Sequence, residues 1–158
     1  MSEALADHNH QHCIDSAIST AERLCQSRDA NLTPVRRRVL ELIWQNHEPV
    51  GAYALLDQLK DDGFNSAPPT VYRALDFLLE QGLIHRLESK NAFIGCPDPD
   101  HPHQGQYLIC DKCGTVAELA DPAMSAAIET LAASQGFQPR RSTVEISGTC
   151  AACAAKAA

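Results

Sequence analysis

The sequence lacks a long apolar run, an excess of basic residues and any segment resembling an export signal, and each absence excludes a class of protein. No stretch of about 18 apolar residues occurs, so we expect no membrane partner. The opening residues, MSEALADHNHQHC, are acidic and polar where a signal peptide is basic and then apolar, which predicts a cytoplasmic protein. Lysine and arginine total 13 against 20 acidic residues, a net charge of -7. A DNA-binding function must therefore depend on local geometry, because phosphate contacts normally supply non-specific affinity.

The rest of the composition is that of an ordinary globular chain. Its 158 residues, 44% of them hydrophobic, suffice for one domain or two small ones. Seven cysteines in a chain without an export signal favour metal ligation over disulfides, because the cytosol keeps thiols reduced. No catalytic triad, phosphate-binding loop or paired-carboxylate pocket can be found, so we expect no enzyme.

The first part of the chain predicts four helices and a hairpin. Thr33 can cap a helix that begins at Pro34, since proline at the first helical position loses no hydrogen bond. Gly63 suits the left-handed position that ends a helix. The helices are expected at about 15–28, 34–45, 52–59 and 68–82, and the strands at 83–89 and 91–96. This order predicts a winged helix-turn-helix domain over residues 19–96, preceded by a flexible tail, residues 1–18.

The second part predicts a small α/β domain, residues 106–158, after a proline-rich hinge, residues 97–105. Strands are expected at 106–110, 115–120 and 141–148, and a helix at 122–134. About 50 residues rarely fold without a metal, a disulfide or a partner chain. The fold class is therefore α+β, with a winged helix followed by a small domain that needs a staple.

Two C-x-x-C pairs, Cys110 with Cys113 and Cys150 with Cys153, are the strongest chemical signal. Each pair follows a predicted strand, and four thiolates brought together make a tetrahedral structural zinc site. The spacing between the pairs is longer than in a compact zinc ribbon. A thiol redox protein is the alternative of a different class, and it is disfavoured because neither pair opens a helix within a βαβ unit.

A second group of possible ligands lies around the hinge: His85, Cys96 and His103, with Glu118 on a strand of the second domain. They are either a buried thiol with surface imidazoles or a metal site between the domains. His101 competes with His103 as a ligand.

Two further features lie outside this group. The tail residues His8, His10, His12 and Cys13 are either a solvated tract, which is favoured, or a third metal site, and Cys25 reads as a core residue.

The run PPTVYRALDFLLEQGLIHRLES, the pairs CDKC and CAAC, and the segment LTPVRRRVLELI together resemble the ferric uptake regulator family of bacterial metal-sensing repressors. The resemblance extends from about Ser19 to Cys153. It implies an N-terminal winged helix that binds DNA and a C-terminal domain that forms a homodimer and carries structural zinc.

The positions at which this sequence departs from the pattern of iron and peroxide sensors indicate the branch of the family that it resembles. Iron and peroxide sensors carry an H-H-x-H cluster ending three residues before the first C-x-x-C cysteine, but residues 104–109 read QGQYLI, and Ser142 falls where a histidine is common. The sequence is instead similar to the zinc uptake regulator branch. That similarity implies a regulatory zinc site formed by His85, Cys96, His103 and Glu118, and hence two Zn²⁺ per subunit. This ligand set also suits zinc chemically, whereas Mn²⁺ and Fe²⁺ favour nitrogen and oxygen ligands.

We therefore expect a zinc-responsive repressor that binds a pseudo-palindromic operator as a dimer; an iron- or manganese-responsive repressor is the alternative within the family. On the recognition helix Arg73 can read guanine, and Tyr72 can contact a phosphate or a thymine methyl group or else pack on the wing. The remaining expected DNA contacts are Thr70, Tyr53, Arg36 and Arg37, although a run of charges such as residues 36–38 is more often a solvated face.

Overall fold

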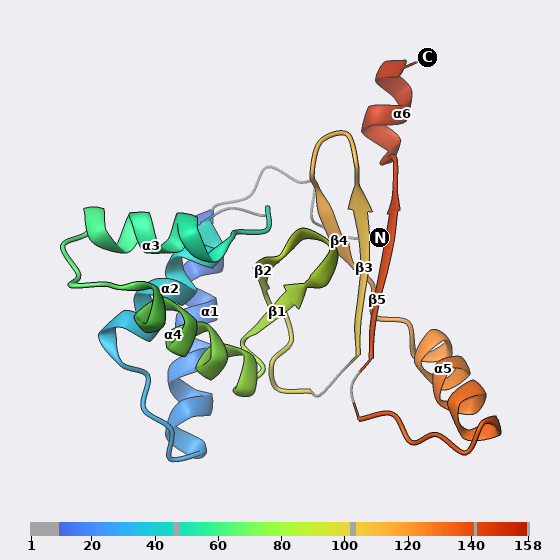
Figure 1. Cartoon of the computed structure of the whole chain (residues 1–158), viewed down its shortest axis with the longest axis horizontal. Helices are drawn as coiled ribbons and strands as arrows, with labels where there is room; N and C mark the ends of the chain where they lie inside the picture. The colour runs from blue at the N-terminus through green and yellow to red at the C-terminus, as the bar shows by residue number, and fades with distance from the viewer. Residues whose placement is uncertain (1–9, 46–47, 102–103, 141, 158) are drawn as a thin grey trace. The chain divides into compact units, whose positions relative to one another are not determined.

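The structure, a computed structural model, describes residues 10–45, 48–101, 104–140 and 142–157. Contacts divide the chain between residues 102 and 103 into two units, the N-terminal unit and the C-terminal unit (Figure 1). The division falls inside the segment expected to act as a hinge, 97–105, whose role stays a prediction. No helix in the described part of the chain is long and apolar enough to cross a membrane.

The N-terminal unit has the predicted order of four helices followed by a hairpin. Its elements are α1 (His10–Ser27), α2 (Pro34–Gln45), α3 (Ala52–Asp61), α4 (Pro68–Glu80), β1 (Ile84–Leu87), the 3-10 turn η1 (Glu88–Lys90) and β2 (Ala92–Gly95). The Thr33 side chain accepts a hydrogen bond from the Arg36 backbone N–H at 3.4 Å, so the expected cap of α2 is present. Strands β1 and β2 pair antiparallel and form the wing.

Helix α1 begins earlier than the sequence predicted. We expected a flexible tail over residues 1–18 and a helix that begins at about residue 15, but the helix already begins at His10. The reason is that Ile14 and Ile18 continue the apolar stripe of Ala21 at helical spacing; Ile18 and Ala21 are buried, and Ile14 packs against the same core. Residues 1–9, including His8, lie outside the described part of the chain.

One core joins the helices to the wing. The side chains of Leu40, Leu59, Leu75 and Leu78 are each at most 1% exposed, and Ile84 of β1 packs in the same cluster. Close packing of these side chains holds the helices and the wing in a fixed arrangement within the N-terminal unit.

The segment before α3 is attached directly to the wing. Val50 and Phe93 exchange two backbone hydrogen bonds, with N–O distances of 2.9 and 2.8 Å. This bridge adds a third chain segment to the β1–β2 hairpin. It therefore fixes the start of α3 relative to β2.

The C-terminal unit is a three-stranded sheet with two helices. Its elements are β3 (Gly105–Cys110), β4 (Val116–Glu118), α5 (Pro122–Ser134), β5 (Thr143–Gly148) and α6 (Ala151–Ala157). The strand order is β4-β3-β5, with β3 antiparallel to β4 and parallel to β5. The short helix α6 was not predicted, because its Ala-rich sequence has no apolar periodicity.

A buried glutamine anchors α5 to the sheet. Gln106 is 2% exposed, and its Nε2 donates to the Asp121 carbonyl at 3.2 Å and to Ser125 Oγ at 3.0 Å. Asp121 in turn caps α5 by accepting the Ala123 backbone N–H at 2.8 Å. The segment that in iron sensors carries the histidine cluster thus contributes an amide that is engaged in holding the fold together.

The C-terminal unit has a thin core by itself. Helix α5 has no buried residue, and large apolar side chains are exposed on the helix, on the loop after it and on the sheet. Leu131 and Phe137 are 68% and 65% exposed, and the neighbouring sheet residues Leu108 and Ile146 are 41% and 44% exposed. A unit with so little internal burial requires a staple or a covering partner.

Candidate metal centre and nucleic-acid interface

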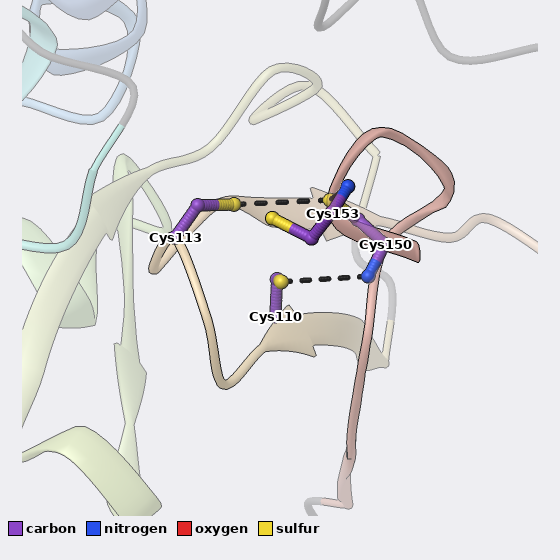
Figure 2. A group of neighbouring side chains, drawn as sticks. All are labelled: Cys110, Cys113, Cys150 and Cys153. Atoms are coloured by element: carbon purple, nitrogen blue, oxygen red, sulfur yellow. Dashed lines mark hydrogen bonds between the residues drawn. The ribbon is translucent and has the colours of Figure 1, made fainter. Parts of the chain in front are cut away.

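Four cysteines meet at one end of the C-terminal sheet. Cys110 ends β3, and its register partner on β5 is Gly148, so the parallel strands bring the two C-x-x-C pairs side by side. Gly114, with φ of +75°, turns the chain after Cys113. The four Sγ atoms of Cys110, Cys113, Cys150 and Cys153 lie within 4.8 Å of one another, with the side chains turned toward a common centre (Figure 2).

The spacing of the sulfur atoms fits zinc. Cys113 Sγ and Cys150 Sγ are 3.8 Å apart. A tetrahedron with Zn–S bonds of about 2.3 Å has edges of about 3.8 Å. The predicted cysteine cluster is therefore confirmed as a group that can hold a metal ion.

The pKa values of Cys110 and Cys153 are shifted in opposite directions. The backbone N–H of Cys150 donates to Cys110 Sγ at 3.4 Å, and these backbone hydrogen bonds lower the pKa of the Cys110 thiol to about 6. The pKa of Cys153 is raised to about 12, mainly because it is hydrogen-bonded to the neighbouring cysteines Cys150 and Cys113. Four adjacent thiolates accumulate negative charge that only a cation can offset, so this arrangement favours metal binding.

The expected regulatory ligands are distributed over both units. In the hairpin His85 pairs with Ile94, and the backbone N–H of Cys96 donates to the Leu83 carbonyl at 3.0 Å. Cys96 lies two residues beyond Ile94, so its side chain and that of His85 occupy diagonal positions on one face of the wing. Cys96 is 3% exposed and His85 is half-buried.

The other two expected ligands belong to the C-terminal unit. Glu118 is half-buried at the end of β4, opposite Tyr107. His103 lies outside the described residues. The assembly of these four residues into one site therefore stays a prediction.

His101 and the histidine tract behave differently from that group. His101 is exposed, and its Nδ1 lies 2.9 Å from Asp98 Oδ1, which raises the pKa of the imidazole. A metal ion at His101 would have to displace both this contact and the proton that the carboxylate favours. His10, His12 and Cys13 fall in the first turn of α1, and Cys25 is buried in the core as predicted.

The residues expected to contact DNA bases lie on α3 and α4. Tyr53, at the start of α3, is 73% exposed, and Tyr72 of α4 is 45% exposed. The two tyrosines line one shallow depression together with Leu56 and Val71. Arg73 is exposed beside Tyr72, and none of the ion pairs found in the described part of the chain involves it. Thr70 is half-buried in the first turn of α4.

The arginines of α2 are already engaged within the chain. The Arg36 guanidinium lies 3.8 Å from the centre of the Phe77 ring and donates to the Asn31 carbonyl. Arg37 pairs with Glu22 and with Glu41, which raise the pKa of the guanidinium. A phosphate contact at Arg36 or Arg37 would compete with these interactions, so their predicted role in DNA binding stays untested.

The chain has a winged-helix unit followed by a unit whose four cysteines can hold a metal ion, an architecture that suits a metal-binding, DNA-binding protein. The model of the ferric uptake regulator family matches residues 27–147. The chain belongs to the ferric uptake regulator family, as its motifs implied.

Individual relatives and solved structures place the chain within that family. It is 44% identical over 137 residues to a zinc uptake regulation protein of Escherichia coli K12, covering 86% of this chain and 80% of the relative. It resembles the structure of a zinc uptake regulator complexed with zinc and DNA at 41% identity, with a TM-score of 0.87 over 92% of this chain and 98% of the other. Holo XcZur gives 46% identity and a TM-score of 0.82, covering 89% and 98%.

Proposed function

We propose that this protein is a zinc-responsive transcriptional repressor that controls zinc uptake genes by binding operator DNA as a dimer. The observation that carries this proposal is the similarity, along 92% of the chain, to a zinc uptake regulator bound to zinc and DNA. In this proposal it acts by metal ligation and DNA contact and not as an enzyme, as the transcription regulators similar to it suggest.

Each subunit binds two zinc ions in this proposal. The four cysteines of the C-terminal unit hold the structural ion, supported by their mutual distances and their shared position at the sheet end. His85, Cys96, His103 and Glu118 hold the regulatory ion. The diagonal placement of His85 and Cys96 on one face of the wing supports this assignment.

Regulation follows from the distribution of those ligands. His85 and Cys96 belong to the DNA-binding unit, whereas His103 and Glu118 belong to the C-terminal unit. A zinc ion bound by all four stabilises only arrangements of the units in which the ligands converge. Zinc therefore shifts the population of unit arrangements toward one that fits the operator.

A second copy of this chain covers the C-terminal unit in the proposed dimer. The register pairs Leu108 with Ile146, so the sheet presents two adjacent exposed apolar side chains, and β5 is an edge strand. Burial of such a surface supplies the stabilisation that the thin core lacks. A symmetric dimer presents two winged helices to successive major-groove half-sites about one DNA turn apart.

The recognition contacts are carried by residues that the fold leaves accessible. Arg73 presents a guanidinium fork that makes no ion pair with any residue the structure describes, and such a fork suits guanine O6 and N7. Tyr53 and Tyr72 face a common shallow depression, and their rings suit thymine methyl groups or sugars. Thr70, in the first turn of α4, suits a phosphate contact, while Arg36 and Arg37 contribute only if their intrachain partners release them.

The alternatives are less well supported. For an iron or manganese sensor, the three histidine positions of the H-H-x-H cluster are occupied by Gln104, Gly105 and Tyr107, none of which carries an imidazole. For a thiol redox protein, a single C-x-x-C pair suffices, whereas here all four thiols form one cluster with the spacing of a zinc tetrahedron.

Operator binding measured across buffered zinc concentrations tests the proposal, with the native chain, Cys96→Ser and Cys25→Ala as a matched control. Cys25 is a buried core thiol on α1. We expect the native chain and Cys25→Ala to bind the operator only above a threshold zinc concentration, and Cys96→Ser to lose the response. A normal response in Cys96→Ser would exclude this regulatory site.

A further inference from the structure

The N-terminal unit contains a pocket of about 220 Å³ between the first turns of α1, the end of α2 and the segment after β2. It has room for several water molecules or a hydrated ion. Its lining includes His12, Cys13 and Cys96. Two thiols and an imidazole, all of them zinc ligands by chemistry, therefore face one cavity.

These three groups differ in their access to solvent. His12 is exposed, Cys13 is half-buried and Cys96 is 3% exposed. Cys13, Ala17 and Thr20 recur at helical spacing, so one face of α1 is turned into the pocket. The pocket thus presents possible ligands in order of increasing burial, ending at the thiol that we assign to regulatory zinc.

The walls around Cys96 are held in place from two sides. Arg23 of α1 donates to both carboxylate oxygens of Asp100, at 2.8 and 2.7 Å. A Cβ atom at Gly95 would lie 2.3 Å from the ring of Trp44, so this backbone is packed directly on α2. Cys96 lies between these two anchored points and is 3% exposed, so its thiol has little direct access to an ion in solvent.

The pocket is not a tight site in advance of binding. Among the residues that the structure describes, only the four-cysteine cluster brings three or more ligand atoms within 4.8 Å of one another. His12, Cys13 and Cys96 can therefore hold an ion by fewer ligands at a time. Weak binding of this kind is what a transfer site requires, because the ion must leave it again.

We propose that this pocket is the zinc entry site, in which His12 and Cys13 capture Zn²⁺ from solvent and pass it to Cys96. The inference rests on the proposed role of Cys96 in the regulatory site. On capture, the Cys13 thiolate and the His12 imidazole replace zinc-bound waters, and the Cys13 proton passes to solvent. On transfer, the Cys96 thiolate replaces that of Cys13, Cys96 loses a proton to solvent, Cys13 takes one up, His12 dissociates, and no electrons are transferred. The entry site changes the rate at which zinc arrives and leaves, and leaves its final affinity unchanged.

The rate of zinc uptake tests this inference in the full-length protein. Trp44 is the single tryptophan of the chain and lines the same pocket, so its fluorescence reports zinc reaching Cys96. The variants are His12→Ala combined with Cys13→Ser, and Ser16→Ala as a matched control that lines the pocket without a zinc ligand. Zinc is supplied from a chelate that buffers the free ion at a limiting concentration, to protein that retains its structural zinc.

We expect uptake and release both to slow by the same factor in the double variant, because the ion must then reach and leave Cys96 without an intermediate ligand. The equilibrium zinc affinity should stay within twofold of the native value, and Ser16→Ala should match the native rates. Unchanged rates in the double variant overturn the inference. A fall in affinity that accounts for the slower uptake also overturns it, because the residues would then belong to the final site.

Cys96→Ser separates this inference from the proposed function. If that variant keeps its zinc-dependent operator binding, the proposed regulatory site is wrong. If it loses the response while the double variant takes up zinc at the native rate, the regulatory site stands and the entry site alone is excluded.

Discussion

Arg23 of α1 donates to both carboxylate oxygens of Asp100 across 77 positions of sequence. Both side chains are partly exposed, so the pair contributes less than about 1 kcal/mol to folding. Its effect lies in positioning the segment between Cys96 and His103. We expect Asp100→Asn to raise the zinc concentration for half-maximal operator binding about threefold, a shift of well under 1 kcal/mol, with thermal stability nearly unchanged.

The matched control is the charge-reversed double variant Arg23→Asp with Asp100→Arg, which restores the pairing in the opposite sense. Zinc titrations of operator binding should place it close to the native chain. If Asp100→Asn itself responds to zinc like the native chain, the pair has no positioning role.

Removing one ligand of the cysteine cluster should unfold the C-terminal unit. Cys113→Ser leaves three thiolates where tetrahedral zinc needs four ligands, and structural zinc contributes on the order of 10 kcal/mol to small metal-stapled domains. We expect the zinc content to fall by at least one ion per chain and the dimer to be lost. Metal analysis and sedimentation measure both, with Cys25→Ala as the control that should retain zinc and dimer.

Zinc loading of the cysteine cluster should weaken as the pH falls. At neutral pH Cys153, with its pKa raised to about 12, is a thiol that must release its proton to bind zinc. The apparent zinc affinity should therefore rise about tenfold per pH unit for each proton released. Below about pH 6 the dependence steepens, because Cys110 also becomes protonated. Competition with a chelator across pH measures this, and a flat profile near neutrality would contradict the assigned ligands.

Arg73 and Arg37 should differ in their effect on DNA binding. Arg73→Lys keeps the charge but loses the two parallel guanidinium hydrogen bonds to guanine. The free-energy difference between binding the operator and binding an operator in which the contacted guanine is replaced should therefore fall by about 1–3 kcal/mol. Arg37→Lys should change affinity little, because the native side chain is paired with Glu22 and Glu41. Titrations of both operators with both variants check this. Equal losses for the two arginines would show that α2 also contacts the DNA.

Gly95→Ala should strain the region next to Cys96. The added Cβ would lie 2.3 Å from the Trp44 ring, and overpacking of this kind costs about 1–3 kcal/mol. Gly51→Ala is the matched control, since nothing lies within 4 Å of a Cβ there. Denaturant unfolding followed by Trp44 fluorescence measures both variants, and equal stability of the two would contradict this packing.

Local signals in the sequence predicted most of the fold. Thr33 with Pro34 marked the start of α2, and the helix predicted over 122–134 matches α5. The first turn of α1 was missed because the polar residues around His12 show no apolar periodicity, and the apolar pattern that predicted the helix begins at Ile14. Helix α6 was missed because a run of alanines favours a helix but gives no alternation of apolar and polar residues from which a buried face could be predicted.

The two metal sites differ in how far sequence could define them. The cysteine pairs carry their own spacing signal, and the parallel register of β3 and β5 brings them together. The regulatory ligands are single residues that the sequence scatters over two units, so their assignment needed a family resemblance. The pocket that joins His12 and Cys13 to Cys96 had no sequence signal, since it exists only where the first turns of α1, the end of α2 and the segment after β2 line one cavity.

The bridge between Val50 and Phe93 has a consequence for how a signal moves through the N-terminal unit. Tyr53 follows Val50 by three residues, and Cys96 follows Phe93 by three. The exposed ring of Tyr53 and the buried thiol of Cys96 therefore stand at equal sequence distance from one pair of backbone hydrogen bonds. Because these bonds tie the start of α3 to β2, we expect a displacement at the end of β2 to be passed to the residues of α3 that are proposed to contact DNA.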